Sequence, residues 1–186
     1  ISTLRSLLHS GDKIRRIDGI FTVVKSYVMF RISPPPNVST CSQFDVTCSK
    51  GVFEGDTNAS SGACSFSQAI REAVQLGLTE DDPNQDLSNE YAARVLMSLA
   101  RELGMDQDNE TEQIQRNSDT LLDMEDSVDF HNLPPQIDEQ VQKRVDAAKA
   151  KGCVLRSIAS IDVKSKSIQI QILEVPYHHV FAVSPP

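Results

Sequence analysis

The sequence of 186 residues predicts one α+β domain, with a mixed β-sheet covered by helices on one face and a β-hairpin at the carboxyl end. Two hydrophobic periods predict this class. Apolar and polar residues alternate over 168–175, which is typical of a strand with one buried face. Apolar residues recur every three to four positions over 66–74 and 91–103, which is typical of amphipathic helices. The length suits a single domain with a sizeable core.

The carboxyl-terminal hairpin consists of two predicted strands, 154–163 and 168–175, which are rich in β-branched residues. The polar turn Lys-Ser-Lys-Ser at 164–167 separates them. From Ile168 onwards isoleucine alternates with glutamine, so we expect one buried face and one wet face.

Four further elements precede the hairpin. We expect helices at 2–11, 65–77 and 138–152 and a strand at 13–21. Ser65 and Gln68 form a capping box at the start of the second of these helices. Gly19, within the predicted strand, marks a close approach of another group to the backbone.

Residues 76–104 form the most informative stretch. Gly77 can end one helix because glycine adopts the left-handed conformation without a Cβ penalty. An acidic segment follows, and we expect Asp86 or Ser88 to cap the next helix, which ends at Gly104. The apolar residues of that helix are predicted to share one buried face. They are Tyr91, Val95, Leu99 and Leu103, with Ala92, Leu96 and Ala100 beside them.

The acidic segment places Glu80, Asp81, Asp82 and Asp86 within seven positions. Carboxylates at this density must face water, a cation or an ammonium group, because burying an unpaired charge is costly. One interpretation is a solvated loop with a helix cap. A second is a site for a hard cation such as Ca²⁺, and a third is a site for an amino group.

Residues 31–63 break the regular pattern. Pro34, Pro35 and Pro36 forbid regular structure, and the stretch that follows is rich in Ser, Thr, Gly and Asn. We expect one domain over 1–186 with a disordered insertion at 31–63. A functional lid and an error in the gene sequence are the alternatives.

Composition restricts the partners. The net charge is −8, and between Glu80 and Glu139 seventeen acidic residues face three basic ones, which argues against a nucleic-acid partner. No window approaches eighteen apolar residues, so we expect no membrane span. Four cysteines at spacings that fit no zinc pattern are interpreted as free thiols. The chain starts without methionine or a signal-peptide pattern, so we expect part of a longer cytoplasmic protein.

A resemblance to a known family rests on three segments. LGLTEDDPNQDL at 76–87, followed by Ala93 and Arg94, resembles the signature of the homoserine dehydrogenase catalytic domain. KIRRIDGIF at 13–21 and the VLR and VPYHHVFA segments of the carboxyl end resemble the same family. The resemblance covers nearly the whole chain outside the insertion and implies that family's α+β catalytic-domain fold.

The resemblance implies an activity and a set of site residues. The family interconverts aspartate semialdehyde and homoserine with NAD(P), in the aspartate pathway that leads to threonine and methionine. Thr79, Glu80 and Asp86 match positions that contact the small amino-acid substrate. A homodimer in the cytoplasm, or in the plastid of a plant or alga, is also implied.

The cofactor side departs from the family pattern. Thr22, Val23 and Val24 occupy the positions of a Ser-Gly-Thr turn that lies against substrate and cofactor in the family, and we expect the two valines to crowd such a site. A dinucleotide site needs a glycine-rich turn between a strand and a helix, and the sequence contains no Gly-x-Gly. NAD(P) therefore requires an upstream domain.

The catalytic positions also depart. The family's acid/base aspartate and lysine fall on Tyr91 and Val95, and losing a general acid typically costs about 10²–10⁴-fold in rate. We expect the chain to be inactive in isolation. The alternative is a degenerate, non-catalytic homologue that acts as a binding or dimerisation module. Lys25, beside the altered turn, is a candidate replacement for the missing cation.

Overall fold

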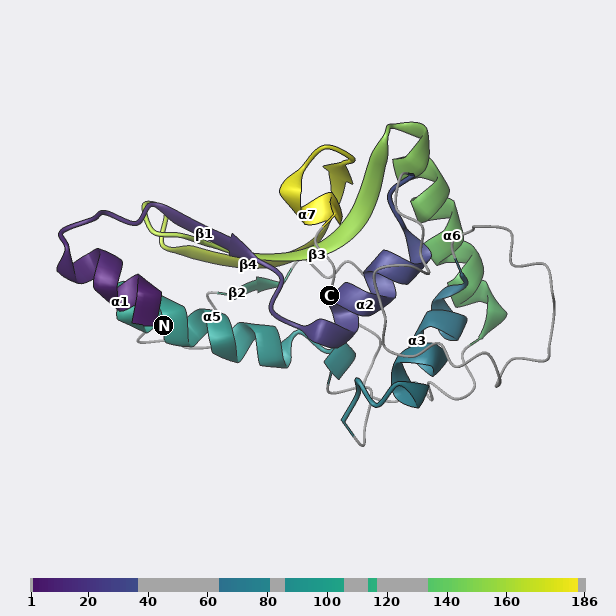
Figure 1. Ribbon diagram of the computed structural model, residues 1–186, viewed down its shortest axis with the longest axis horizontal. Coiled ribbons are helices and arrows are strands. Elements are labelled where there is room, and N and C mark those ends of the chain that lie inside the picture. Colours follow the sequence, from purple (N-terminus) through teal and green to yellow (C-terminus); the bar gives the residue numbers. More distant parts are fainter. Residues whose placement is uncertain (1, 37–63, 81–85, 106–113, 117–133, 184–186) are drawn as a thin grey trace.

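The computed structural model describes residues 2–36, 64–80, 86–105, 114–116 and 134–183. In these residues a long, curved sheet lies above a row of helices (Figure 1). The predicted α+β class is confirmed.

The sheet is mixed, as predicted. Its strand order is β1-β3-β4-β2, with β2 parallel to β4 and the other pairs antiparallel. The strands are β1 (Arg16–Gly19), β2 (Ile114–Arg116), β3 (Cys153–Asp162) and β4 (Ser167–Pro176). The predicted hairpin is β3 and β4. β3 is displaced by one residue from its predicted bounds and β4 is one residue longer at each end, which is the usual uncertainty at strand ends.

Two groups of helices cover one face of the sheet. The first group lies under the β1 end, and the second lies under the opposite end of β3 and β4 (Figure 1). The first group is α1 (Ser2–His9) and α5 (Glu90–Glu102), and the second is α2 (Val23–Ile32), α3 (Phe66–Gln75) and α6 (Pro135–Ala150). A short helix, α7 (Val180–Val183), packs on the other face of the strands, a position that the sequence did not predict.

The core follows this division. One cluster joins α2, α3 and α6 to Leu155 and Ile172 of the hairpin. A second packs α5 against Ala159, Ile161 and other hairpin residues. Both helix groups are therefore joined through the same two strands, β3 and β4. Within the second group, α3 and α6 are also joined by hydrogen bonds, because the Asp138 carboxylate accepts from the Ser67 amide at 2.8 Å and from the Ser67 hydroxyl at 2.6 Å.

Helix α2 is absent from the elements that the sequence predicts. Eight of its ten residues are buried, so it has no polar face and shows no helical period. Arg31 and Ile32, which are predicted to start the insertion, are instead the last turn of this buried helix. The described chain continues to Pro36, and residues 37–63 lie outside the described residues.

The predicted buried face of α5 is confirmed at Ala92, Leu96 and Ala100 and is wrong at Tyr91. Tyr91 is 56% exposed, whereas Ala92, Ala93, Leu96 and Ala100 are buried against the sheet. Small alanines let the helix backbone approach the strands closely, which improves packing. The remaining predicted core positions, Val95, Leu99 and Leu103, are half-buried.

Candidate functional site

The site predicted from the sequence is built where the start of α2 meets the segment between α3 and α5. Val24 of the first turn of α2 belongs to the same core cluster as Leu87, and Leu78 packs against that cluster. The amino ends of α2 and α5 lie side by side (Figure 1), and a hydrogen bond between Lys25 and Asn89 joins them. Residues far apart in sequence thus meet at one place.

The segment begins at the end of α3. Gly77 has a φ of +67°, in the left-handed region, and so confirms the predicted helix stop. The Leu78 amide returns to the Ala73 carbonyl at 3.0 Å. At the other end of α3, the Ser65 hydroxyl accepts a hydrogen bond from the Gln68 amide at 3.2 Å, which is one half of the predicted capping box. The Gln68 side chain donates to Glu72 at 3.2 Å. Gly77 and the hydrogen bond of the Leu78 amide together set the direction in which the chain leaves α3.

Glu80 and Asp86 are brought together. The Asp86 carboxylate accepts a hydrogen bond from the Glu80 backbone amide at 2.7 Å. The Glu80 side chain itself is exposed. Thr79, next to it, is half-buried. Asp81 and Asp82 lie outside the described residues.

The next helix is capped differently from the prediction. Asn89 is the N-cap residue of α5, and its side chain makes no cap hydrogen bond. The Ser88 hydroxyl accepts from the Glu90 amide at 3.3 Å, whereas Asp86 bonds Glu80 instead. Of the two predicted caps, Ser88 is the one that contacts the helix.

Lys25 is buried at this place. Its side chain is on the first turn of α2, and the residue is 2% exposed. Its ammonium donates to the Asn89 side-chain oxygen at 2.6 Å. Lys25 is a candidate cation on sequence grounds, but nothing in the local pattern indicates that Asn89 would be its partner.

The two valines predicted to crowd the cofactor side are the first two residues of α2, and they lie in different environments. Thr22 is the extended N-cap residue of α2 and makes no side-chain cap bond. Val23 is 58% exposed, whereas Val24 is 3% exposed and part of the core. Val23 alone can therefore crowd a ligand at this surface. Gly19 has the predicted close neighbour, because a Cβ built there would lie 2.8 Å from the Phe21 ring.

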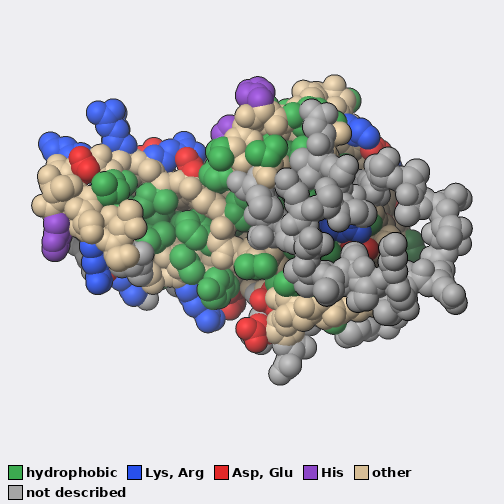
Figure 2. All heavy atoms as spheres, in the orientation of Figure 1, with side chains coloured by type: hydrophobic (Ala, Val, Ile, Leu, Met, Phe, Trp, Pro, Cys, Tyr) green, Lys and Arg blue, Asp and Glu red, His purple; other side chains and the backbone are tan. Residues whose placement is uncertain are grey.

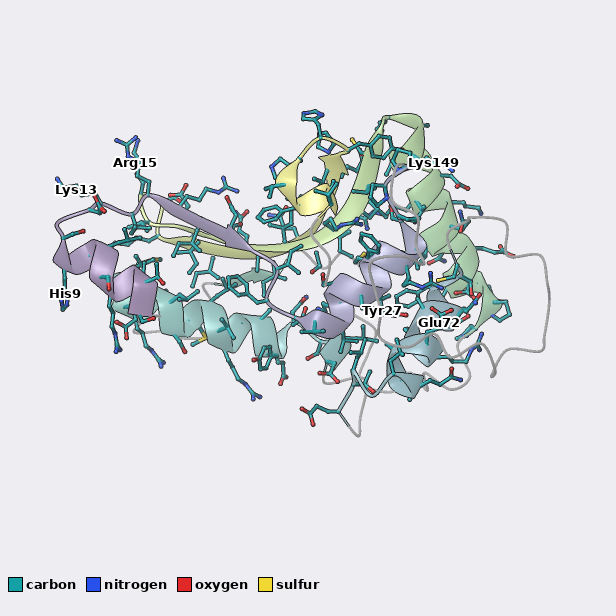
Figure 3. All side chains as sticks on the ribbon, viewed as in Figure 1. His9, Lys13, Arg15, Tyr27, Glu72 and Lys149 are labelled. Atoms are coloured by element: carbon teal, nitrogen blue, oxygen red, sulfur yellow. The ribbon has the colours of Figure 1, made fainter. Side chains whose placement is uncertain are left out.

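A second polar cluster lies between α2 and α3. Arg31 and Glu72 form a two-pronged ion pair, Nε to Oε2 at 2.7 Å and a terminal nitrogen to Oε1 at 3.0 Å, and the Tyr27 hydroxyl donates to Glu72 at 3.3 Å. Burial raises the pKa of Tyr27 to about 12 and that of the Cys64 thiol to about 11. Tyr27 and Glu72 face each other in Figure 3.

This cluster was not predicted from the sequence. The four-residue spacing of Tyr27 and Arg31 on one helix is the signal that could have indicated it. The hydrogen-bonded Glu72 carboxylate holds the pKa of Arg31 above its usual value. Because these side-chain bonds run from α2 to α3, the cluster serves to join the two helices.

Charge is distributed unevenly over the surface. Lys and Arg side chains gather at the end formed by α1 and β1 (Figure 2). Lys13 and Arg15 are among them, and Figure 3 shows them far from Tyr27.

Within the residues that the structure describes, no three His, Cys, Asp or Glu side chains come together as metal ligands, and no helix is long and apolar enough to cross a membrane.

Comparison with known proteins decides the family. A family model described as homoserine dehydrogenase matches residues 1–185. The chain belongs to the homoserine dehydrogenase family. It is 34% identical over 183 residues to the chloroplastic bifunctional aspartokinase/homoserine dehydrogenase 1 of Arabidopsis thaliana, a match that covers 98% of this chain and 17% of the relative.

Solved structures agree on the fold. A Candida auris protein of unknown function matches with a TM-score of 0.72 and 27% identity, over 98% of this chain and 45% of the other. A putative homoserine dehydrogenase from Archaeoglobus fulgidus matches with a TM-score of 0.54 and 18% identity, over 92% of this chain and 38% of the other. This chain thus spans less than half of these relatives.

The described residues of this homoserine dehydrogenase domain do not fit a dinucleotide by themselves. The turn at Thr22 offers one exposed valine, and the next residue is in the core. Glycines with left-handed backbone occur at helix ends and at Gly11, none of them in a strand–turn–helix unit that could hold a pyrophosphate.

The two positions at which the sequence is predicted to depart from the homoserine dehydrogenase motif lie one turn apart on α5. Tyr91 is exposed on its first turn, and Val95 follows half-buried. Valine has no ionisable group, so the position cannot transfer a proton. The Tyr91 hydroxyl is the group at these two positions that could donate one.

Proposed function

We propose that this chain is the substrate-binding part of an NAD(P)-dependent homoserine dehydrogenase of the aspartate pathway, and that it is inactive in isolation. The substrate is aspartate semialdehyde or homoserine. The observation that carries the proposal is the hydrogen bond between the Asp86 carboxylate and the Glu80 amide. It joins two described residues of the segment that resembles the family's substrate-contacting motif.

Glu80 is assigned the role of binding the amino group of the substrate. Its carboxylate is exposed next to a backbone held by Asp86 at 2.7 Å. A charge-assisted hydrogen bond from an ammonium group to a carboxylate is among the stronger polar contacts in proteins. Thr79, adjacent and half-buried, has a hydroxyl that can orient the same ligand.

In this proposal, the hydride-carrying cofactor is bound by residues outside this chain. NAD(P) would supply hydride chemistry from an upstream domain, while the residues here bind and orient the amino acid. We expect the complete polypeptide to form a homodimer, located in the cytoplasm or, in a plant or alga, in the plastid. The Arabidopsis relative is named as chloroplastic.

A second candidate function is a non-catalytic binding or dimerisation module. Val95 and the exposed Tyr91 favour it, because the site then lacks a lysine one turn into α5. Turnover without a positioned general acid would be about 10²–10⁴-fold slower. The two candidates share the same fold and differ in whether the complete protein turns over.

Both candidates are separated by one experiment on the complete polypeptide. Homoserine oxidation is followed by the absorbance of NAD(P)H, in the wild type, in Glu80→Ala and in a control, Glu174→Ala, which removes the partner of Lys151 on β4. Activity above background that Glu80→Ala abolishes and Glu174→Ala retains supports the enzyme. If homoserine binds in calorimetry without turnover, the binding module is supported instead.

A further inference from the structure

Burying the ammonium group of Lys25 is energetically unfavourable. Charged side chains are almost never fully buried unless they are paired, and Lys25 is 2% exposed. It also lies on the first turn of α2, where the helix dipole is positive and disfavours a cation. Its retention in the interior therefore depends on the groups that hold it.

The Asn89 side chain bonds Lys25 and does not cap its own helix, α5. Asparagine at an N-cap normally accepts a hydrogen bond from an amide of the first turn. Here the Asn89 side chain makes no cap bond, and its oxygen accepts from Lys25 at 2.6 Å. The Ser88 hydroxyl contacts the Glu90 amide in its place. The residue thus joins two helices instead of capping one.

This bond completes the frame around the acidic segment. The segment is held at its start by the Leu78 amide on the Ala73 carbonyl. The Asp86 carboxylate accepts a hydrogen bond from the Glu80 amide, and Leu87 is 2% exposed within the core. Two residues after Leu87, Asn89 carries the bond to α2, so the carboxyl side of the segment is tied to the turn at Thr22 through Lys25.

We propose that Lys25 is a positioning residue for the amino-acid site. Through Asn89 it holds the amino end of α5, and with it Asp86 and Glu80, at a set distance from the start of α2. The inference rests on the proposed function, because it concerns the same site. It assigns to Lys25 an effect on substrate affinity that acts through Asn89, without contact to the substrate.

The test uses calorimetric titration of the complete polypeptide with L-homoserine. Lys25→Met is expected to weaken binding by about tenfold or more. Asn89→Leu, which removes the acceptor, should weaken it comparably, and Asn89→Asp, which keeps an oxygen for the ammonium, should restore affinity to near the wild-type value. Lys151→Met, at the exposed C-cap of α6, is the lysine control and should leave affinity unchanged.

The outcomes are distinct. Melting temperatures are measured for every variant, and if Lys25→Met does not fold, the Asn89→Leu and Asn89→Asp pair decides, because Asn89 is only half-buried. Wild-type affinity in a folded Lys25→Met or Asn89→Leu variant overturns the positioning role alone. Absence of homoserine binding in the wild type overturns the proposed function, and the positioning role with it.

Discussion

The Arg156 guanidinium donates to the Ala182 carbonyl at 2.7 Å and so ties the carboxyl-terminal segment to the centre of the fold. Arg156 is 1% exposed, and its described partners are backbone carbonyls and the face of the Phe30 ring, at 5.3 Å. The other carbonyls belong to Met29, Ser33, Leu155 and Phe181. Two of them lie at the end of α2, where carbonyl dipoles favour a cation.

Replacing Arg156 by Met should be strongly destabilising. Several buried carbonyls would lose their donor, and we expect a loss of about 3–5 kcal/mol in the free energy of unfolding. Arg156→Lys should rescue little, because an ammonium cannot reproduce the planar fork of donors. Denaturant titration measures both, with the exposed Arg71→Met as control. A loss below about 1 kcal/mol for Arg156→Met would contradict this account.

The Arg31–Glu72 pair should matter more than an exposed pair of the same kind. Its side chains are 25% and 17% exposed, against 77% and 63% for Arg94 and Glu90. Glu72→Gln is expected to cost about 2–3 kcal/mol because it leaves a half-buried guanidinium with a weaker partner. Glu90→Gln, the matched control, should cost less than about 0.5 kcal/mol. Equal losses in urea unfolding would show that burial does not distinguish them.

Stability should fall at alkaline pH. Burial raises the pKa of Cys64 from 9.0 to about 11 and that of Tyr27 from 10.0 to about 12. Between each pair of values the folded protein holds a proton that the unfolded chain has lost, so the free energy of unfolding decreases as pH rises. The stabilisation is complete below the lower value of each pair and is lost as pH rises to the upper one.

The pH prediction is checked by unfolding at a series of pH values. Tyr27→Phe removes the ionisable hydroxyl and should flatten the decline above about pH 10. Cys64→Ala should flatten the earlier part, from about pH 9. A wild-type stability that stays constant through this range would show that neither group is held protonated by the fold.

Restoring the family residues on α5 should raise activity. In the complete polypeptide, the double variant Tyr91→Asp with Val95→Lys returns an acid/base pair to positions one turn apart. We expect homoserine oxidation to increase by about 10²-fold or more. Ser98→Lys, which adds a lysine at an exposed position of the same helix, should have no effect. No gain over the wild type would argue that the site has lost more than these two groups.

Local patterns in the sequence determined much of the fold. The alternation from Ile168 predicted the hairpin, and Gly77 predicted a helix stop that its φ of +67° confirms. These features depend on neighbours in sequence, because strand alternation and helix termination are properties of the local backbone. The motif at 76–87 was also sufficient to indicate the family.

Other features were decided by packing. A helix buried on all sides has no polar face, so α2 could not be recognised from its period. The predicted face of α5 is confirmed at Ala92, Leu96 and Ala100, which are buried, and wrong at Tyr91, which is 56% exposed. Close approach of a helix to a sheet favours the smaller side chains.

The residue pairs that shape the site belong to the tertiary structure alone. The sequence by itself determined the family, the hairpin and the acidic segment. It did not indicate that Lys25 would meet Asn89, 64 positions away, or that Arg31 would meet Glu72, 41 positions away. Such contacts arise when the cores of α2, α3 and the hairpin close, because burial then makes an unpaired charge costly and selects its partner.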